Sequence, residues 1–195
     1  MTTTDVQILG KEYTDECVRI ALLNKKIGGT RVLSAEKYQQ LLTKSDNIIR
    51  IGYFENEKLV SWVSIGFYES KMRGKFWAIT ELFTTVFKER FSFSRPEFGL
   101  IFKRAFEIAE ERGYFQYFYC IAERLERVYE RQWRKNPWGF NGRYELITLD
   151  VVPANTKPEF ELYWRLMGQE LKSDNIVIKS RRLKNHESFI DIKND

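Results

Sequence analysis

Near the N-terminus, hydrophobic residues recur at spacings of three and four, the pattern of amphipathic helices. The pattern predicts one helix over residues 14–26 and a second over residues 34–45, after a short strand at residues 5–12. The buried face of the first helix is expected to hold Cys17, Ile20 and Ala21. Helices that follow a strand so early in the chain indicate an α/β layer arrangement.

The hydrophobic period then changes from helical spacing to alternation. Residues 47–55 and 59–68 alternate as half-buried strands do, and the polar turn Asn56-Glu57-Lys58 joins them, so a β-hairpin is expected. Residues 77–85 predict a third strand. Three consecutive strands without a helix between them favour a mixed sheet.

A well-marked helix follows these strands. Ser94 and Glu97 are spaced as a capping box, Pro96 suits a first turn, and Gly113 suits the helix end. The residues expected to face the sheet are Phe98, Ile101, Phe102, Ala105, Ile108 and Ala109. Residues 114–122 are almost entirely apolar, as in a strand buried on both faces, so the region predicts a βαβ unit.

The last third of the chain repeats the alternation of helices and strands. We expect helices near residues 123–135 and 159–171 and strands at residues 144–152 and 176–183, followed by a polar tail. Together with the earlier elements, the order predicts one α/β (α+β) domain.

Composition supports a single folded domain over residues 1–195, with a core at about 7–183 and a polar tail at 184–195. Hydrophobic residues make up 43% and charged residues 30%, which excludes a disordered chain. No apolar run approaches the roughly 20 residues that cross a bilayer. The first ten residues lack the basic and apolar regions of a signal peptide, so a cytoplasmic location is expected.

Cysteine and histidine are scarce. The chain has one histidine, His186, and two cysteines far apart in sequence, so metal sites and His-based nucleophiles are not expected. Cys120 lies in a very apolar segment, and we interpret both Cys17 and Cys120 as buried, reduced thiols.

The element order, together with the segment CIAERLERVYERQWRKNPWGF, resembles the GNAT superfamily of acyl-CoA-dependent N-acyltransferases. In that family a helix that carries a tyrosine follows the fifth strand and is itself followed by Gly-Phe, here Gly139-Phe140. The likeness covers about residues 7–183. It implies a GNAT-like fold with a mixed central sheet of about seven strands flanked by helices. It also implies transfer of an acetyl or other acyl group from acyl-CoA to a primary amine, without a metal.

The resemblance implies where acetyl-CoA, or another acyl-CoA, would bind. The pyrophosphate would sit over residues 92–99, at a helix N-terminus that favours anions. The pantetheine arm would run along a strand edge whose backbone groups are expected to be unpaired. The implied cofactor-binding residues are Phe83, Thr84, Thr85, Ser92, Ser94, Arg95 and Gly99. The family's phosphate loop is richer in glycine than this segment, whose only glycine is Gly99, and a capped surface loop is the alternative interpretation.

Two residues are the candidates for catalysis. The resemblance places Tyr129 at the position of the tyrosine that often protonates the departing thiolate, and a phenol with a pKa of about 10 is neutral at physiological pH. Glu81, near the end of a central strand, is the candidate base that takes a proton from the amine, directly or through water. Alternatively, Tyr129 is a core residue and Glu81 a solvent-facing strand carboxylate.

The net charge of +5 favours anionic ligands without identifying one. The basic clusters Arg131-Arg134-Lys135 and Lys179-Arg181-Arg182-Lys184 are interpreted as a solvated basic face. Nucleic-acid binding is the weaker alternative, because the aromatic residues fall at core spacing and no recognised motif is present.

The expected partner is a small-molecule or peptide amine, with no membrane association. A catalytically idle GNAT-like module, which binds an acyl-CoA or a protein, is the main alternative to an enzyme. The sequence leaves a homodimer open and does not identify the acceptor.

Overall fold

The computed structural model describes residues 2–28, 34–36, 39–40, 47–70, 74–85, 96–122, 126–135, 142–153 and 175–184. The chain divides into two compact units, and each is described by itself. The first unit comprises Met1–Ile65 and Ile79–Ala105, and the second comprises Gly66–Ala78 and Phe106–Asp195.

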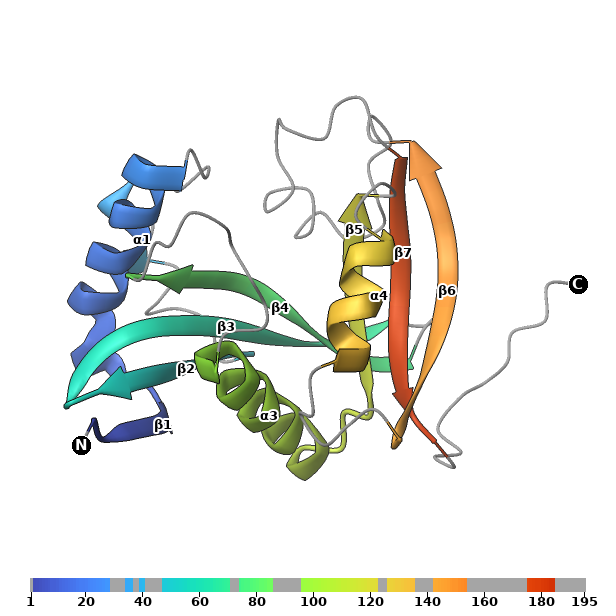
Figure 1. Cartoon of the computed structure of the whole chain (residues 1–195), viewed down its shortest axis with the longest axis horizontal. Coiled ribbons are helices and arrows are strands. Elements are labelled where there is room, and N and C mark those ends of the chain that lie inside the picture. The colour runs from blue at the N-terminus through green and yellow to red at the C-terminus, as the bar shows by residue number, and fades with distance from the viewer. Residues whose placement is uncertain are drawn as a thin grey trace, which may run out of the picture. The chain divides into compact units, whose positions relative to one another are not determined.

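Seven strands form one mixed sheet in the order β1-β2-β3-β4-β5-β7-β6 (Figure 1). The strands are β1 (Thr4–Ile8), β2 (Ile48–Glu55), β3 (Lys58–Ser70), β4 (Gly74–Thr84), β5 (Gln116–Ala122), β6 (Tyr144–Pro153) and β7 (Asn175–Leu183). β4 pairs with β5 in parallel, whereas β1 pairs with β2, and β7 with both β5 and β6, in antiparallel fashion. The predicted mixed sheet of about seven strands is confirmed.

The helical elements in the described part of the chain are η1 (Lys11–Tyr13), α1 (Thr14–Gly28), α3 (Pro96–Glu111) and α4 (Glu126–Lys135). The first predicted strand is shorter than expected: β1 ends at Ile8, and a 3-10 turn follows, closed by the Tyr13 N–H and the Gly10 carbonyl at 3.3 Å. Residues 35–36 and 39–40 of the predicted second helix are helical. The predicted helix 159–171 lies outside the described residues.

The predicted hairpin forms with a two-residue turn between β2 and β3. Asn56 and Glu57 have φ values of 48° and 65°, both in the left-handed region. Such a turn matches the right-handed twist of the strands that it joins. Asparagine tolerates this conformation well, whereas glutamate adopts it only because the strands on both sides fix the turn.

The helix α3 ends as the sequence predicts. Gly113 has φ 78°, its N–H bonds the Glu110 carbonyl at 3.0 Å, and the Tyr114 N–H bonds the Ala109 carbonyl at 2.8 Å. These two bonds make a Schellman motif, which satisfies carbonyls that the helix end would leave free. The six residues expected to face the sheet are all buried, namely Phe98, Ile101, Phe102, Ala105, Ile108 and Ala109.

The first unit has a hydrophobic core between α1 and the sheet. Cys17, Ile20 and Ala21 are buried there, as the helical spacing predicts. Trp62 of β3 packs on Phe83 of β4 with ring centroids 5.0 Å apart. The indole N–H of Trp62 donates to the Cys17 carbonyl at 3.2 Å, so the large ring is buried with its polar group satisfied.

The core of the second unit is aromatic. Trp77 of β4 packs edge-on against Phe106 of α3 and lies 4.5 Å, between ring centroids, from Tyr117 of β5. Phe106 also contacts Trp133 of α4 and Tyr144 of β6. These rings join α3, α4 and the strands of this unit, and all five are buried, as the core spacing of the aromatic residues predicts.

Candidate functional site

The end of β4 carries the predicted base. Glu81 is half-buried on this strand, and its Oε2 accepts a hydrogen bond of 2.9 Å from the Ser64 hydroxyl of β3. A carboxylate held by a neighbouring strand keeps a fixed direction, which a general base needs. Glu81 is therefore not a freely solvated strand residue.

Phe83 does not expose its ring to a ligand. Its side chain is buried in the core cluster with Trp62, Ile20 and Ala21. A cofactor contact of Phe83 therefore does not come from its ring.

Thr84 has both its side chain and its backbone engaged. The Ser61 hydroxyl donates to the Thr84 hydroxyl at 2.8 Å. The carboxamide of Asn24 bonds both backbone groups of Thr84: its Nδ2 donates to the Thr84 carbonyl at 2.8 Å, and its Oδ1 accepts from the Thr84 N–H at 3.3 Å. The expectation that backbone groups are unpaired at this edge is therefore wrong at Thr84, because a side chain from α1 takes the place of a strand.

The sequence reasoning missed Asn24, although the sequence contains a signal for it. Asn24 follows Cys17, Ile20 and Ala21 at helical spacing, so it occupies a core position of α1 and is buried. A buried carboxamide requires hydrogen-bond partners. Besides Thr84, its Nδ2 bonds the Ile20 carbonyl at 2.7 Å.

The predicted phosphate site is described only in part. Ser92, Ser94 and Arg95 lie outside the described residues, and their assignment stays a prediction. Gly99 lies in the first turn of α3, which begins at Pro96. Glu97, the expected capping-box residue, is buried.

Tyr129 lies in α4, in the second unit, whereas Glu81 belongs to the first. The side chain of Tyr129 is outside the described part of the structure, so its catalytic role stays a prediction. Two other residues of α4, Glu126 and Glu130, face β7 and form ion pairs with it.

These ion pairs correct the interpretation of the second basic cluster. Lys179 and Arg181 of β7 are both buried. The Lys179 ammonium lies 2.5 Å from the Glu126 carboxylate, and the Arg181 Nη2 donates to both oxygens of Glu130 at 2.9 and 3.1 Å. The two residues therefore neutralise acidic groups of α4 and do not belong to a solvated basic face.

Two aromatic residues complete this ionic cluster. The Tyr119 hydroxyl of β5 donates to Glu130 at 3.0 Å, and burial raises the pKa of Tyr119 well above its usual value. The Arg181 guanidinium stacks on the Trp133 ring at 3.8 Å from its centroid, a cation–π contact. The cluster holds α4, and with it the backbone of Tyr129, on β5 and β7.

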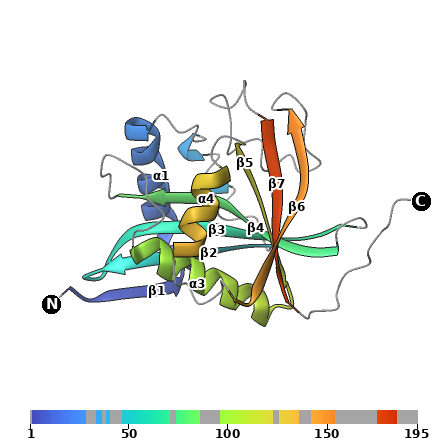
Figure 2. The same cartoon turned by 45° about the vertical axis from the view of Figure 1, so that its right-hand side comes forward.

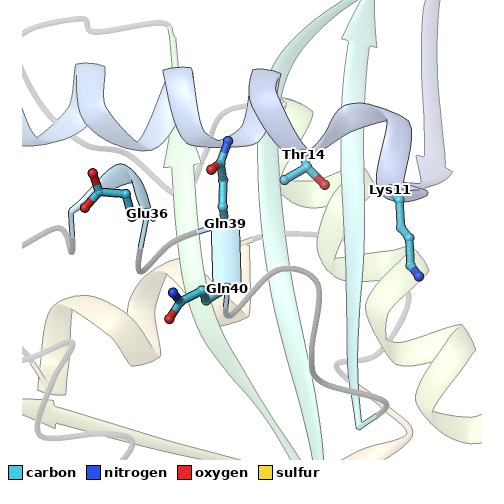
Figure 3. Close-up of a pocket in the computed structure, with 5 residues that line it drawn as sticks. All are labelled: Lys11, Thr14, Glu36, Gln39 and Gln40. Carbon is cyan, nitrogen blue, oxygen red and sulfur yellow. The ribbon is translucent and has the colours of Figure 1, made fainter.

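An open hollow of about 420 Å³ lies elsewhere in the first unit. Figure 3 shows the residues that line it: Lys11, Thr14, Glu36, Gln39 and Gln40. The side-chain amide of Gln39 donates to the Asp15 carboxylate at 3.1 Å. None of these residues belongs to β4.

Cys17 is buried as predicted. Burial raises the pKa of its thiol to about 12, so almost none of it is thiolate at neutral pH. The side chain of Cys120 lies outside the described residues. Among the residues that are described, no group of three or more His, Cys, Asp and Glu side chains could hold a metal ion. No helix in the described ranges is long and apolar enough to cross a membrane.

No protein-family model and no curated protein matches the sequence. Solved structures, in contrast, match over almost its whole length. A GNAT-family acetyltransferase from Streptococcus pneumoniae is 14% identical and matches 93% of this chain and 99% of its own, with a TM-score of 0.58. The chain has the GNAT fold.

Two further proteins show how widely this fold is used. FeeM, an N-acyl amino acid synthase from uncultured soil microbes, is 12% identical over 92% of this chain and 91% of its own, with a TM-score of 0.56. The ribosomal-protein-S18-alanine N-acetyltransferase of Escherichia coli is 7% identical over 96% and 99%, also with a TM-score of 0.56. The predicted resemblance to the GNAT superfamily is thus confirmed for the fold, in a chain of divergent sequence.

Proposed function

We propose that the protein is an N-acyltransferase that transfers an acetyl or other acyl group from acyl-CoA to a primary amine. The observation that carries the proposal is the GNAT fold, matched over 93% of the chain by a GNAT-family acetyltransferase. Because one fold hosts more than one activity, residues of the site must support the function as well. The described residues supply two supporting features, a fixed carboxylate and a strand edge that bonds an amide.

Glu81 is the proposed general base. An alkylamine such as a lysine side chain has a pKa of about 10.4, so it reaches the enzyme as an ammonium ion and must lose a proton before it attacks. Glu81 takes this proton directly or through water, and its hydrogen bond from Ser64 fixes the receiving carboxylate. The neutral nitrogen then attacks the thioester carbonyl carbon.

Tyr129 is the proposed general acid. As the tetrahedral intermediate collapses, the carbon–sulfur bond breaks and the electron pair remains on sulfur. The Tyr129 phenol gives its proton to this thiolate, the phenolate that results takes the second proton from the former amine nitrogen, and the products are an amide and free CoA. This role rests on the position of Tyr129 in α4 and on the resemblance of the surrounding segment to the family.

The proposed cofactor contacts fall into two groups. Ser92, Ser94, Arg95 and the N-terminal turn of α3 with Gly99 would bind the pyrophosphate, since donors and helix dipole both favour anions there. The strand end at Phe83, Thr84 and Thr85 would hold the pantetheine arm, and the backbone of Thr84, which faces away from β3, would bond it. In support, the Thr84 backbone already bonds a carboxamide, that of Asn24, so it fits the amides of pantetheine.

A small molecule or a peptide is the proposed source of the amine. Among the solved structures of the same fold, FeeM is an N-acyl amino acid synthase and the Escherichia coli protein is a ribosomal-protein-S18-alanine N-acetyltransferase. The fold therefore does not select the acceptor. A homodimer, a single domain over residues 1–195 and a cytoplasmic location also stay predictions.

Thermal unfolding with acetyl-CoA tests the proposal. At about 100 times its Kd, a ligand of the folded state adds about 2.7 kcal/mol of stability. In a chain of this size each kcal/mol raises Tm by about 2–4 °C, so a rise of about 5–10 °C is expected. ATP at the same concentration is the control for simple anion binding.

The outcomes separate the alternatives. No rise in Tm with millimolar acetyl-CoA would exclude both the enzyme and the idle acyl-CoA binder. If Tm rises, thiol release with a panel of primary amines separates these two, because only the enzyme releases CoA in an amine-dependent manner. Retention on a polyanion column without any response to acetyl-CoA would favour nucleic-acid binding.

A further inference from the structure

The carboxamide of Asn24 occupies the end of β4 as a neighbouring strand would. Asn24 is only 8% exposed, and the segment that it contacts is 60 residues away in the chain. Its oxygen and nitrogen meet the N–H and the carbonyl of one residue, Thr84, at 3.3 and 2.8 Å. This donor–acceptor pair is the one that a backbone amide presents in a β-ladder.

The direction of the Thr84 groups follows from its neighbour. The Thr85 N–H donates to the Val60 carbonyl of β3 at 2.8 Å, so Thr85 faces β3. Backbone groups of successive residues in a strand point to opposite edges, and those of Thr84 therefore point away from β3. The helix α1 lies beside the end of β4 (Figures 1 and 2), and its Asn24 side chain satisfies this second edge.

We propose that Asn24 is an internal occupant of the Thr84 edge, and that an amide of the ligand displaces it there. This inference rests on the proposed function, because the amide in question is that of the pantetheine arm. A pantetheine amide carries one N–H and one carbonyl, the same pair that Asn24 offers. Both cannot bond the Thr84 backbone at once.

The hydrogen bonds of Asn24 make such a displacement feasible. The Nδ2 also donates to the Ile20 carbonyl, one turn back in the same helix, at 2.7 Å. After leaving Thr84, the side chain keeps this bond, so its amide nitrogen still has a hydrogen-bond partner in the core. The Thr84 backbone also stays paired in both states, first with Asn24 and then with the ligand, so no buried backbone group loses its partner.

Displacement of an internal group lowers the apparent affinity of the ligand. The binding-competent state is the one in which Asn24 has left Thr84, and the apparent Kd rises as the population of this state falls. Substitution Asn24→Ala removes the competitor. The variant should bind acetyl-CoA roughly three- to tenfold more tightly, the equivalent of one net hydrogen bond.

The experiment is titration calorimetry of acetyl-CoA into the wild type, Asn24→Ala and Val18→Ala. Val18 is buried in the same helix and core, so its truncation controls for a general loosening of α1. Tighter binding by Asn24→Ala, with an unchanged Kd for Val18→Ala, supports the displacement. Equal or weaker binding by Asn24→Ala overturns it and leaves Asn24 as a support of the strand end, while the proposed function stands.

A second measurement needs no variant. In the wild type, the Asn24 side-chain NH₂ resonances should move on saturation with acetyl-CoA, and the Thr84 amide should move with them. Saturable binding that leaves the Asn24 signals unchanged overturns the displacement. Failure of the wild type and of both variants to bind millimolar acetyl-CoA overturns the proposed function together with this inference.

Discussion

The buried ion pair between α4 and β7 makes a quantitative prediction about stability. Glu130 accepts two hydrogen bonds from Arg181 and one from Tyr119, and one of its oxygens lies 3.7 Å from the Lys179 ammonium. The side chains of Arg181 and Glu130 are only 5% and 13% exposed. The substitution Glu130→Gln keeps the shape and removes the charge.

The expected loss follows from what remains buried. Removal of one partner of a buried ion pair costs about 3–5 kcal/mol, because the other charge stays without compensation. Lys179 keeps Glu126, so we expect the lower end, about 3 kcal/mol, and a fall in Tm of about 6–12 °C. Among its described contacts, Arg181 has no second carboxylate that could replace Glu130. Its Nε also lacks a hydrogen-bond partner within the described residues.

The assay is chemical denaturation of Glu130→Gln, Arg181→Met and the double variant. Because both changes act on one interaction, the double variant should be more stable than the sum of the single losses predicts, by about 1–3 kcal/mol. Arg143→Met is the matched control, since Arg143 pairs with Glu110 at the surface with 52% of its side chain exposed. This control should cost less than about 1 kcal/mol.

Two results would refute the reasoning about this cluster. One is a Glu130→Gln variant within about 0.5 kcal/mol of the wild type, the range of ordinary surface substitutions. The other is a strictly additive double variant. Either would mean that the pair does not hold α4 on the sheet.

Three further predictions concern the proposed chemistry and the core. Tyr129→Phe should lower kcat by about 10²–10⁴-fold, as expected for loss of a general acid, and leave the Kd of acetyl-CoA unchanged. An unchanged kcat would favour the alternative interpretation of Tyr129 as a core residue without a catalytic role. Glu81→Gln should lower kcat at neutral pH by a factor of at least about 10². This loss of kcat should become smaller as the pH approaches the pKa of the acceptor amine, because the amine then loses its proton without a base; a loss that is constant with pH would contradict the role of base. Burial raises the pKa of Cys17 from 9.0 to about 12, so the folded state favours the neutral thiol. Its contribution to the free energy of unfolding is complete below pH 9 and is lost as the pH rises towards 12, by about 1.4 kcal/mol per pH unit. Denaturation curves of Cys17→Ala should therefore show a smaller fall of this free energy between pH 9 and 12 than those of the wild type. The same fall in both proteins would contradict the raised pKa of Cys17.

Local patterns predicted the local elements of the fold. The turn at Asn56, the glycine stop at Gly113 and the buried stripe of α3 each depend on a few neighbouring residues, so the sequence shows them directly. The parallel pairing of β4 with β5 followed from the helix between them. Glu81 lies on β4, where the sequence predicted a strand over residues 77–85.

Long-range pairings account for what the sequence did not reveal. Asn24 bonds a residue 60 positions away, and no local pattern names that partner. Along the sequence alone, Lys179 and Arg181 belong to a cluster of basic residues, which is the pattern of a basic surface. In a strand they share one face, and in α4 the spacing of Glu126 and Glu130 also puts both on one face, so the four charges meet once α4 packs on β7.

The binding of acyl-CoA along the end of β4 is the central claim, and an NMR titration tests it most directly. Amide resonances of ¹⁵N-labelled protein are followed as acetyl-CoA is added, with attention to Phe83, Thr84 and Thr85. The account predicts a saturable shift that is largest at Thr84 and does not occur with ATP. A titration to millimolar acetyl-CoA in which none of these three amides moves would contradict it.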